Sequence, residues 1–416
     1  MYEIITLPNG LRIAAEHMSA VRSAAVGIWV GVGSRMETLS EAGSAHFIEH
    51  MLFKGTTAHS AAELAGRMDA IGGQCNAFTT RDSTCFYARC LDTHLNEAAD
   101  ILAEMFFDSL FAEEDVVNER GVVLEEIDMY RDTPEDLVSE ELLKAVFPGP
   151  LGRSVLGRPA ALKKMTGESL RSFKERHYRP DRVVVSLCGS FTDEHVQHLA
   201  RLFSPLQPGK RPPLSKARYT PGRTIKRRNT EQNHFCLGWE GLPNGSDDRF
   251  AWQLMSTVFG EGLSSRLFQT IREKHGLCYS IGSFAASYAE TGLFVISTAL
   301  NRESEEKALR LIMDEVERLR QDGITQTELD RARELIKSNL VMGLESTSAR
   351  MNRLGAAILQ QGRCLSAEEV MDRYDAVERE DVLQLARRMF SGTGCAFSAL
   401  GRVREREAYE TLLTIR

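Results

Sequence analysis

The sequence predicts an α+β protein of two related domains, each a mostly antiparallel sheet covered by helices. The 416-residue chain is longer than one hydrophobic core usually serves. Its apolar (43%) and charged (26%) fractions are those of a globular protein. Short strand-like runs and longer helical patterns also recur in a similar order in the two halves, which favours two domains of one plan.

The first half opens with a predicted hairpin that turns at residues 8–10. Strand 24–33 then leads into helix 44–53. A second helix runs over 60–73, from a capping box of Ser60 and Glu63 to a glycine stop. The further elements expected here are a strand pair within 74–90, helices near 93–108 and 113–130, strand 182–188 and helix 192–203.

The second half repeats this order from strand 235–240 onward. Its other expected elements are helices near 247–258 and 264–274, a strand pair within 278–299, helices near 303–320 and 326–347, strand 395–400 and a short terminal helix. Between the halves, the stretch 204–223 contains five of the twelve prolines. The predicted domains are therefore 1–208 and 224–416, joined by a linker at 209–223.

Composition excludes several classes of protein. A net charge of −7 without a Lys/Arg-rich tract argues against nucleic-acid binding. The longest apolar runs, such as 24–33, are strand-length and too short to span a membrane. The first residues show no basic and apolar leader, so a cytoplasmic location is expected. The eight cysteines form no CxxC pair, so they are expected to be reduced and to bind no zinc.

The stretch SAHFIEHMLFKGT, from residue 44, contains the sequence HxxEH. On a helix, His46 and His50 lie on one face and can present two imidazole nitrogens to one point. Two imidazoles and one carboxylate are a common shell for catalytic zinc, with a position left for water. Glu49 flanks the same face and could take the proton of that water as a general base. The alternative is a buried amphipathic helix with two satisfied core histidines.

A third ligand could come from the helical stretch NERGVVLEEIDMYRD, residues 118–132. Glu119 and Glu126 are seven positions apart on one face, and Val122 and Val123 lie on or next to that face, so we expect it to be buried. Buried carboxylates require a cation or a hydrogen-bond donor, and zinc is one such cation. Spacing alone does not distinguish Glu126 from Glu125, nor exclude solvated glutamates on an acidic helix.

These residues resemble the pitrilysin/insulysin/mitochondrial processing peptidase family of inverted zinc metallopeptidases, most closely its short two-domain bacterial branch. The resemblance covers essentially the whole chain, and Glu126 lies at the family's usual distance from His50. It implies that one Zn²⁺ per chain is bound by His46, His50 and Glu126. It also implies that Glu49 is the general base and that Glu119 supports a metal-bound histidine.

Further segments share this resemblance. Residues 72–88 resemble the family's substrate-binding strand, with Asn76 and Ala77 beside the metal, and such a strand edge can bind extended peptides. Residues 259–280 resemble the segment with the family's Arg/Tyr pair, here Arg272 and Tyr279, which would bind substrate carbonyls and the tetrahedral oxyanion. The second half has no HxxEH, as the family leads us to expect.

The sequence therefore predicts a zinc-dependent endopeptidase that hydrolyses peptides or unfolded, presequence-like segments. The resemblance implies a dimeric chamber, as a homodimer or as a heterodimer with a related subunit. A non-catalytic partner subunit is the second hypothesis, although such members usually lack the intact motif. A small-molecule lyase of the S-ribosylhomocysteine-cleaving type is the third, and the length of this chain counts against it.

Overall fold

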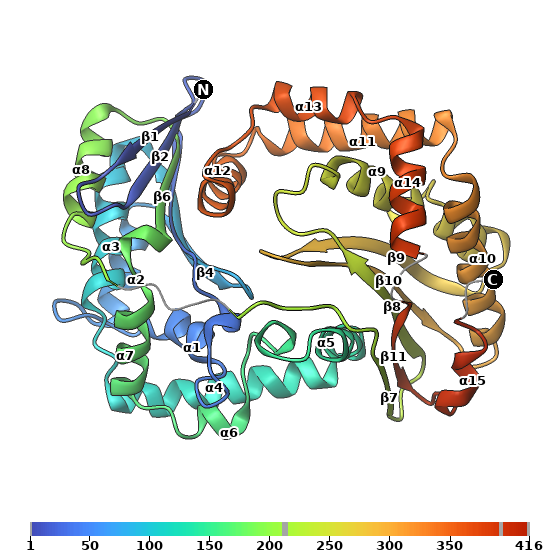
Figure 1. Ribbon diagram of the computed structural model, residues 1–416. Helices are drawn as coiled ribbons and strands as arrows, with labels where there is room; N and C mark the ends of the chain where they lie inside the picture. Colours follow the sequence, from blue (N-terminus) through green and yellow to red (C-terminus); the bar gives the residue numbers. More distant parts are fainter. Residues whose placement is uncertain (1, 210–214, 391–393, 414–416) are drawn as a thin grey trace. The chain divides into compact units, whose positions relative to one another are not determined.

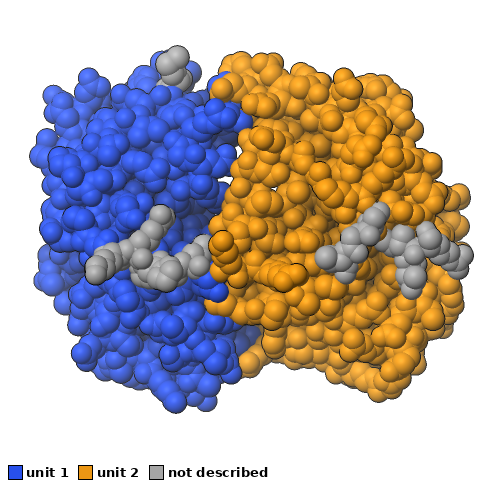
Figure 2. All heavy atoms as spheres, viewed as in Figure 1, with its two compact units in different colours: residues 1–127, 153–215, 341–366 blue, residues 128–152, 216–340, 367–416 orange. Residues whose placement is uncertain are grey.

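Figure 1 shows the computed structural model of the chain, which describes residues 2–209, 215–390 and 394–413. Contacts between residues divide the chain into two compact units, which Figure 2 shows in separate colours. Unit 1 consists of residues 1–127, 153–215 and 341–366, and unit 2 of residues 128–152, 216–340 and 367–416. Each unit contains one sheet with helices packed on it, which confirms the predicted α+β class.

The sheet of unit 1 has the strand order β1-β2-β6-β3-β5-β4. Neighbouring strands are antiparallel except for the parallel pair β2 and β6. The predicted hairpin is present, because β1 and β2 pair across residues 8–10. The strands are β1 (Tyr2–Thr6), β2 (Arg12–His17), β3 (Ser23–Val30), β4 (Gln74–Thr79), β5 (Thr84–Leu91) and β6 (Val183–Gly189).

The sheet of unit 2 has the order β7-β11-β8-β10-β9, and only β7 and β11 are parallel. Apart from β1, the two sheets share one plan, because β2, β6, β3, β5 and β4 correspond in turn to β7, β11, β8, β10 and β9. The predicted internal repeat is therefore a repeat of topology. The strands are β7 (Arg223–Arg227), β8 (Asn233–Gly241), β9 (Cys278–Ser287), β10 (Gly292–Leu300) and β11 (Ala396–Gly401).

The central strands of the unit 1 sheet are buried on both faces. In β6, Val183 and Val185 join the cluster that includes α1 and α3, whereas Val184 joins the cluster that includes α12. Because side chains alternate along a strand, a strand covered on both faces is largely apolar, and Ser186 is the polar exception in β6. The helices of this unit are α1 (Ser44–Met51), α2 (Ala61–Ala70), α3 (Leu95–Asp108), most of α4 (Glu113–Asp132), α6 (Pro159–Leu162), α7 (Gly167–His177), α8 (Asp193–Phe203) and α12 (Thr347–Gln361), with short turns η1 (Ser34–Met36), η2 (Asp92–His94) and η4 (Pro180–Arg182).

The unit 2 sheet is also covered on both faces. Helix α5 (Pro134–Val146) packs Val138 and Leu142 against one face, and on the other face Trp239 of β8 contacts Phe390 of α14. The remaining elements of this unit are η3 (Pro150–Gly152), α9 (Arg249–Gly260), the π-helix η5 (Phe268–Lys274), α10 (Glu305–Asp322), most of α11 (Gln326–Gly343), α13 (Ala367–Asp375), α14 (Arg379–Phe390) and α15 (Arg406–Glu410).

One helix from each half of the chain packs on the sheet formed by the other half. Helix α5 belongs to the first half but covers the sheet of unit 2, and α12 belongs to the second half but covers the sheet of unit 1. The units therefore differ from the expected domains 1–208 and 224–416. Neither helix was among the expected elements, and an amphipathic pattern does not specify the sheet that a helix covers. Within the expected linker 209–223, residues 210–214 lie outside the described residues.

Two expected helices differ in detail. The helix expected over 264–274 contains a π-helix at Phe268–Lys274, and the helix expected over 326–347 ends at Gly343, four positions before α12 begins. None of the helices in the described parts of the chain combines the length and the apolarity that crossing a bilayer requires.

Candidate metal centre

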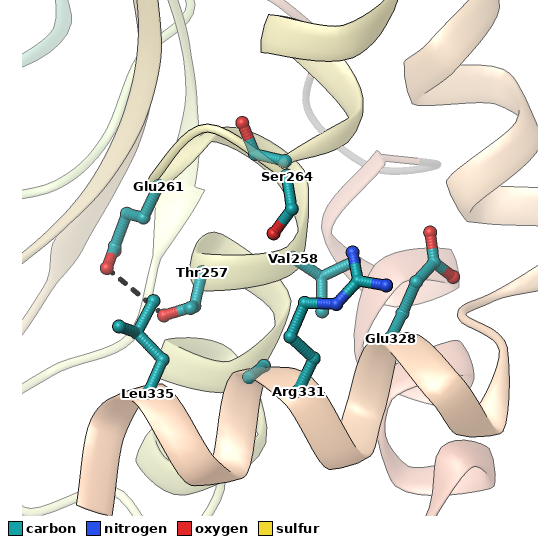
Figure 3. A pocket seen from close by; sticks show the side chains of 9 residues that line it. Thr257, Val258, Glu261, Ser264, Glu328, Arg331 and Leu335 are labelled. Carbon is teal, nitrogen blue, oxygen red and sulfur yellow. Dashed lines mark hydrogen bonds between the residues drawn. The ribbon is translucent and has the colours of Figure 1, made fainter. Parts of the chain in front are cut away.

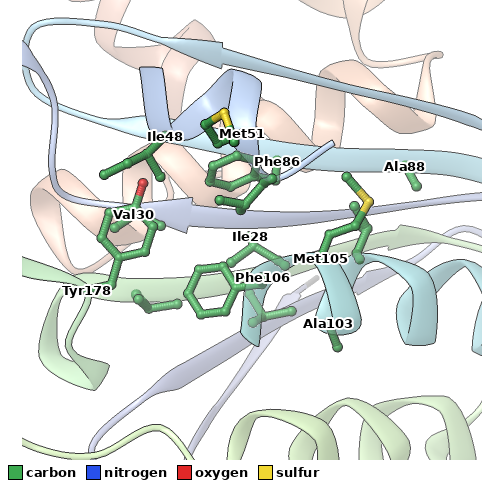
Figure 4. Close-up of a cluster of buried hydrophobic side chains, with 14 of the residues drawn as sticks. Ile28, Val30, Ile48, Met51, Phe86, Ala88, Ala103, Met105, Phe106 and Tyr178 are labelled. Atoms are coloured by element: carbon green, nitrogen blue, oxygen red, sulfur yellow. The ribbon is translucent and has the colours of Figure 1, made fainter. Parts of the chain in front are cut away.

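Helix α1 is fixed by the hydrophobic core of unit 1. Phe47, Ile48 and Met51 are fully buried, and Figure 4 shows Ile48 and Met51 close to Phe86 of β5. Because these residues occupy the core face, Glu49 and His50 lie on a half-buried part of the helix. The helix therefore presents the polar residues of the HxxEH motif in a fixed orientation.

The first turn of α1 is capped by a carboxylate from outside the helix. Gly43, the N-cap residue, has φ 107° and offers no side chain. The buried Glu37 replaces it, because its two oxygens accept hydrogen bonds from the N–H groups of Gly43 (2.7 Å) and Ala45 (2.8 Å). Burial raises the pKa of Glu37 to about 8, although these hydrogen bonds act in the opposite direction.

Three potential ligand atoms converge beside this helix. The Nε2 atoms of His46 and His50 are 3.3 Å apart, and Glu126 Oε2 lies 3.5 Å from the first and 3.6 Å from the second. Within the described residues, no second group of His, Cys, Asp and Glu side chains converges in this way. The fold thus brings Glu126 of α4 next to His46 and His50 of α1, although Glu126 and His46 are 80 positions apart in the sequence.

The three atoms fit a tetrahedral zinc ion. Zinc–nitrogen bonds of about 2.05 Å at tetrahedral angles separate neighbouring ligand atoms by about 3.3 Å. Burial and the neighbouring His50 lower the pKa of His46 to about 4, so its ring is neutral with a free lone pair at pH 7. The neighbouring His50 lowers the pKa of Glu126, so this group is a carboxylate. Two imidazoles and a carboxylate are a ligand set that zinc accepts.

Glu119 orients one of the two imidazoles. Its Oε1 accepts a hydrogen bond from His50 Nδ1 at 2.8 Å, and its Oε2 lies 2.6 Å from Lys54 Nζ. Burial alone would raise the pKa of Glu119, but Lys54 and His50 lower it below its usual value. Since an ionised carboxylate only accepts, Nδ1 of His50 carries a proton, and the neutral form of this ring faces the cluster with a lone pair on Nε2. The buried Nδ1 of His46 has no such partner among the described residues.

The structure distinguishes between the two candidate glutamates of α4. Glu126 is half-buried and joins the histidines, whereas Glu125 is exposed to solvent. The buried face of this helix includes Glu119 and Val123, as expected. Val122, which lies next to that face, is 49% exposed. On a helix the residue next to a buried position turns by about 100°, and here that turn reaches solvent.

Glu49 lies beside the cluster without belonging to it. Its Oε2 accepts a hydrogen bond of 2.5 Å from Thr79 Oγ1 at the end of β4, and burial raises its pKa above the usual value. A carboxylate whose pKa is shifted toward neutrality is a better proton acceptor from water than an exposed one. The arrangement thus places a potential general base next to three potential metal ligands.

Strand β4 lies at one edge of its sheet. It pairs with β5 on one side, and no strand among the described residues pairs with its other side. Asn76 is exposed, and its side chain accepts a hydrogen bond of 2.8 Å from the N–H of Ala77. An open edge of this kind can pair with an extended peptide through backbone hydrogen bonds.

Arg272 and Tyr279 form a pair at the surface of unit 2. The Arg272 guanidinium lies 5.4 Å from the centre of the Tyr279 ring, whose residue is 80% exposed. Helix α9 precedes this pair in the sequence. Glu261, at the end of α9, accepts hydrogen bonds from residues of that helix, including Thr257 (Figure 3). These bonds fix the turn that precedes the π-helix with Arg272.

Comparison with known proteins decides the family. A model described as insulinase (peptidase family M16) matches residues 12–158, and one described as peptidase M16 inactive domain matches residues 164–336. The chain belongs to the M16 peptidase family. A Bacillus subtilis (strain 168) protein named as the uncharacterized zinc protease YmxG is 40% identical over 94% of this chain and 96% of its own length. An uncharacterized zinc protease of Rickettsia felis is 35% identical over 94% of this chain and 95% of its own length.

Solved structures share the fold of this M16 chain. A protease from Helicobacter pylori superimposes with a TM-score of 0.88 over 96% of this chain and 99% of its own, at 22% identity. A Pseudomonas fluorescens structure described as a peptidase M16 inactive domain has a TM-score of 0.89 over 97% of this chain and 98% of its own, at 20% identity. These likenesses confirm the predicted architecture.

Sequence reasoning missed three residues that shape this site in the M16 chain. Lys54, which pairs with Glu119, lies four residues after His50 and just beyond the end of α1, so its closeness to the motif in sequence was the available signal. Thr79 gave no local signal, because it contacts Glu49 through the tertiary fold, and Glu37 caps α1 from six and eight positions upstream, outside the helix.

Proposed function

We propose that this M16 chain is a zinc-dependent endopeptidase whose site consists of His46, His50 and Glu126, with Glu49 as the general base. The convergence of three ligand atoms at 3.3–3.6 Å, next to a carboxylate outside the set, carries this proposal. The names of the relatives as zinc proteases support it. One zinc ion per chain is part of the proposal.

When bound, zinc supplies Lewis-acid chemistry that polarises a carbonyl and makes water more acidic. The residues of the chain perform the remaining work. Glu49 removes a proton from the attacking water and returns it to the leaving amine. Thr79 holds the Glu49 carboxylate in place, and Glu119 holds His50. The open edge of β4 aligns the peptide by backbone pairing, so that the substrate is an extended or unfolded segment.

We also propose that two copies associate, and that Arg272 and Tyr279 of one copy contribute to the site of the other. The exposure of Tyr279 supports a role at a surface that substrate or a partner can reach. A heterodimer with a related subunit, in which this chain is the catalytic member, is the alternative assembly. The expected cytoplasmic location stays a prediction.

The test compares wild-type protein with Glu49→Gln in metal content and in cleavage of a quenched fluorescent peptide. Because Glu49 is outside the ligand set, the variant should retain about one zinc per chain while turnover falls by several orders of magnitude. Glu125→Gln, which changes an exposed acid of α4, is the control and should behave as wild type. Equal turnover of wild type and Glu49→Gln would refute the proposed role. A zinc-loaded wild type that cleaves no peptide would favour the non-catalytic partner subunit.

A further inference from the structure

We propose that a cleft between α2, α3 and the start of β4 binds an apolar side chain of the peptide substrate, several residues from the bond that is cut. The cleft lies wholly within unit 1 and has a volume of about 420 Å³. That size is typical of sites that enclose an organic group. This inference rests on the proposed peptidase function and adds a preference for substrates with an apolar residue at one position.

One wall of the cleft is a single face of α2. Ala61, Leu64, Ala65 and Met68 line it, and their spacing of three and four residues places them on one side of the helix. Two of these residues are alanines, so the wall is hollowed where larger side chains would fill it. An apolar helix face that remains open to a cavity can bind an apolar group through the hydrophobic effect.

The opposite wall is equally apolar. Ile101 and Met105 of α3 and Phe53 after α1 line it, and Gly73 closes the end next to β4. A Cβ at Gly73 would lie 2.5 Å from the sulfur of Met68, so any other residue there would displace the Met68 side chain that lines the cleft. Among the lining residues, Asp69 alone carries a charge, and it is exposed at the rim. The chemistry of the cleft therefore suits an aliphatic or aromatic side chain.

The open edge of β4 would direct substrate side chains into this cleft. The N–H of Ala77 donates to the exposed Asn76 side chain, so Ala77 directs its backbone groups to the open edge. In a strand this orientation alternates, so Cys75, Ala77 and Thr79 share it. The side chains of Cys75 and Ala77 pack on the face of the sheet that α1 and α3 cover. Substrate residues paired opposite them would turn their side chains to that same side.

The register relates the cleft to the proposed cleavage site. Cys75 lines the cleft, and Thr79, four residues further along β4, holds the Glu49 carboxylate. Four strand residues span about 13 Å. A substrate residue in the cleft therefore lies about four positions from the residue next to Glu49, on one side of the bond. The alternation of side chains holds whether the peptide runs parallel or antiparallel to β4.

The first measurement uses a host peptide in which alanine is replaced in turn by leucine, phenylalanine, lysine or glutamate at each position around the cleaved bond. Wild-type protein should show at least about a tenfold higher kcat/KM for leucine or phenylalanine over alanine at one position, two to four residues from the bond on one side, chiefly through KM. The affinities of these peptides for the Glu49→Gln protein should follow the same ranking. This binding measurement tests the cleft even if no peptide is cut.

Variants of α2 assign any preference to the cleft. Ala65→Leu fills the cavity and should bring the leucine-to-alanine ratio close to one, both in cleavage and in binding. Ala62→Leu is the matched control, because Ala62 is exposed on the same helix and does not line the cleft. An apolar preference that survives in Ala65→Leu, or no preference at any position, would overturn the inference. A preference for lysine that Asp69→Asn abolishes would also overturn the inference. In each of these cases, cleavage of the alanine peptide that depends on Glu49 would still support the proposed function.

Discussion

Replacing Glu119 with glutamine tests how strongly a residue beyond the ligands supports the proposed metal site. The carboxylate accepts a hydrogen bond from His50 Nδ1 at 2.8 Å and pairs with Lys54 at 2.6 Å. Glutamine retains the shape and one acceptor oxygen but removes the charge. A hydrogen bond to a charged group contributes about 1.5–3 kcal/mol and a neutral one about 0.5–1.5 kcal/mol, so roughly 1–1.5 kcal/mol is lost.

That loss corresponds to about a tenfold weaker zinc affinity, the lower end of the 10- to 100-fold range typical of residues that support metal ligands. Competition with a chromogenic chelator at pH 7.5 would measure it. Glu125→Gln removes the same charge from an exposed position of α4 and should retain the wild-type affinity. If both variants bind zinc as wild type does, or if both lose affinity equally, the hydrogen bond to His50 has no special role.

Further predictions concern the core, the helix cap and the assembly. Burial raises the folded-state pKa of Glu37 from 4.5 to about 8, so the folded state binds the extra proton between these values. The unfolding free energy of metal-free wild type should therefore fall relative to Glu37→Gln as pH rises from 5 to 8, and parallel urea-unfolding profiles would contradict this. Gly355→Ala should lower the free energy of unfolding by roughly 1–3 kcal/mol, because its Cβ would lie 2.2 Å from a tryptophan ring of β3. Gly66→Ala is the control and should not destabilise, because a Cβ there would lie in open space. Equal urea-unfolding midpoints of the two variants would argue against the position of α12. Mixing Glu49→Gln with Arg272→Ala chains should partly restore peptide cleavage if sites are shared between copies, and an inactive mixture would argue for independent sites.

Local patterns predicted the parts of the site that local geometry determines. The spacing of His46 and His50 predicted two nitrogens facing one point, and their Nε2 atoms lie 3.3 Å apart. The capping box of Ser60 and Glu63 predicted the start of α2, and both of its hydrogen bonds are present. Alternation and turn residues predicted the strands, because these signals depend on neighbours in the sequence.

Features that depend on distant contacts could not be predicted in this way. Spacing alone left Glu125 and Glu126 equivalent, since only the packing of α4 determines which of them faces the histidines. The hydrogen bond from Thr79 to Glu49 joins residues 30 positions apart, and no sequence period relates them. Helices α5 and α12 are a further case, because neither was expected from the sequence and the sheet that each covers depends on distant contacts.

The zinc content of Glu126→Gln, compared with wild type and Glu125→Gln after chelation and reloading, tests the proposed metal centre most directly. Both wild type and Glu125→Gln should retain about one zinc per chain through gel filtration, and Glu126→Gln should lose most of it because two imidazoles alone would remain. A Glu126→Gln protein that retains zinc as firmly as wild type would contradict the three-residue site.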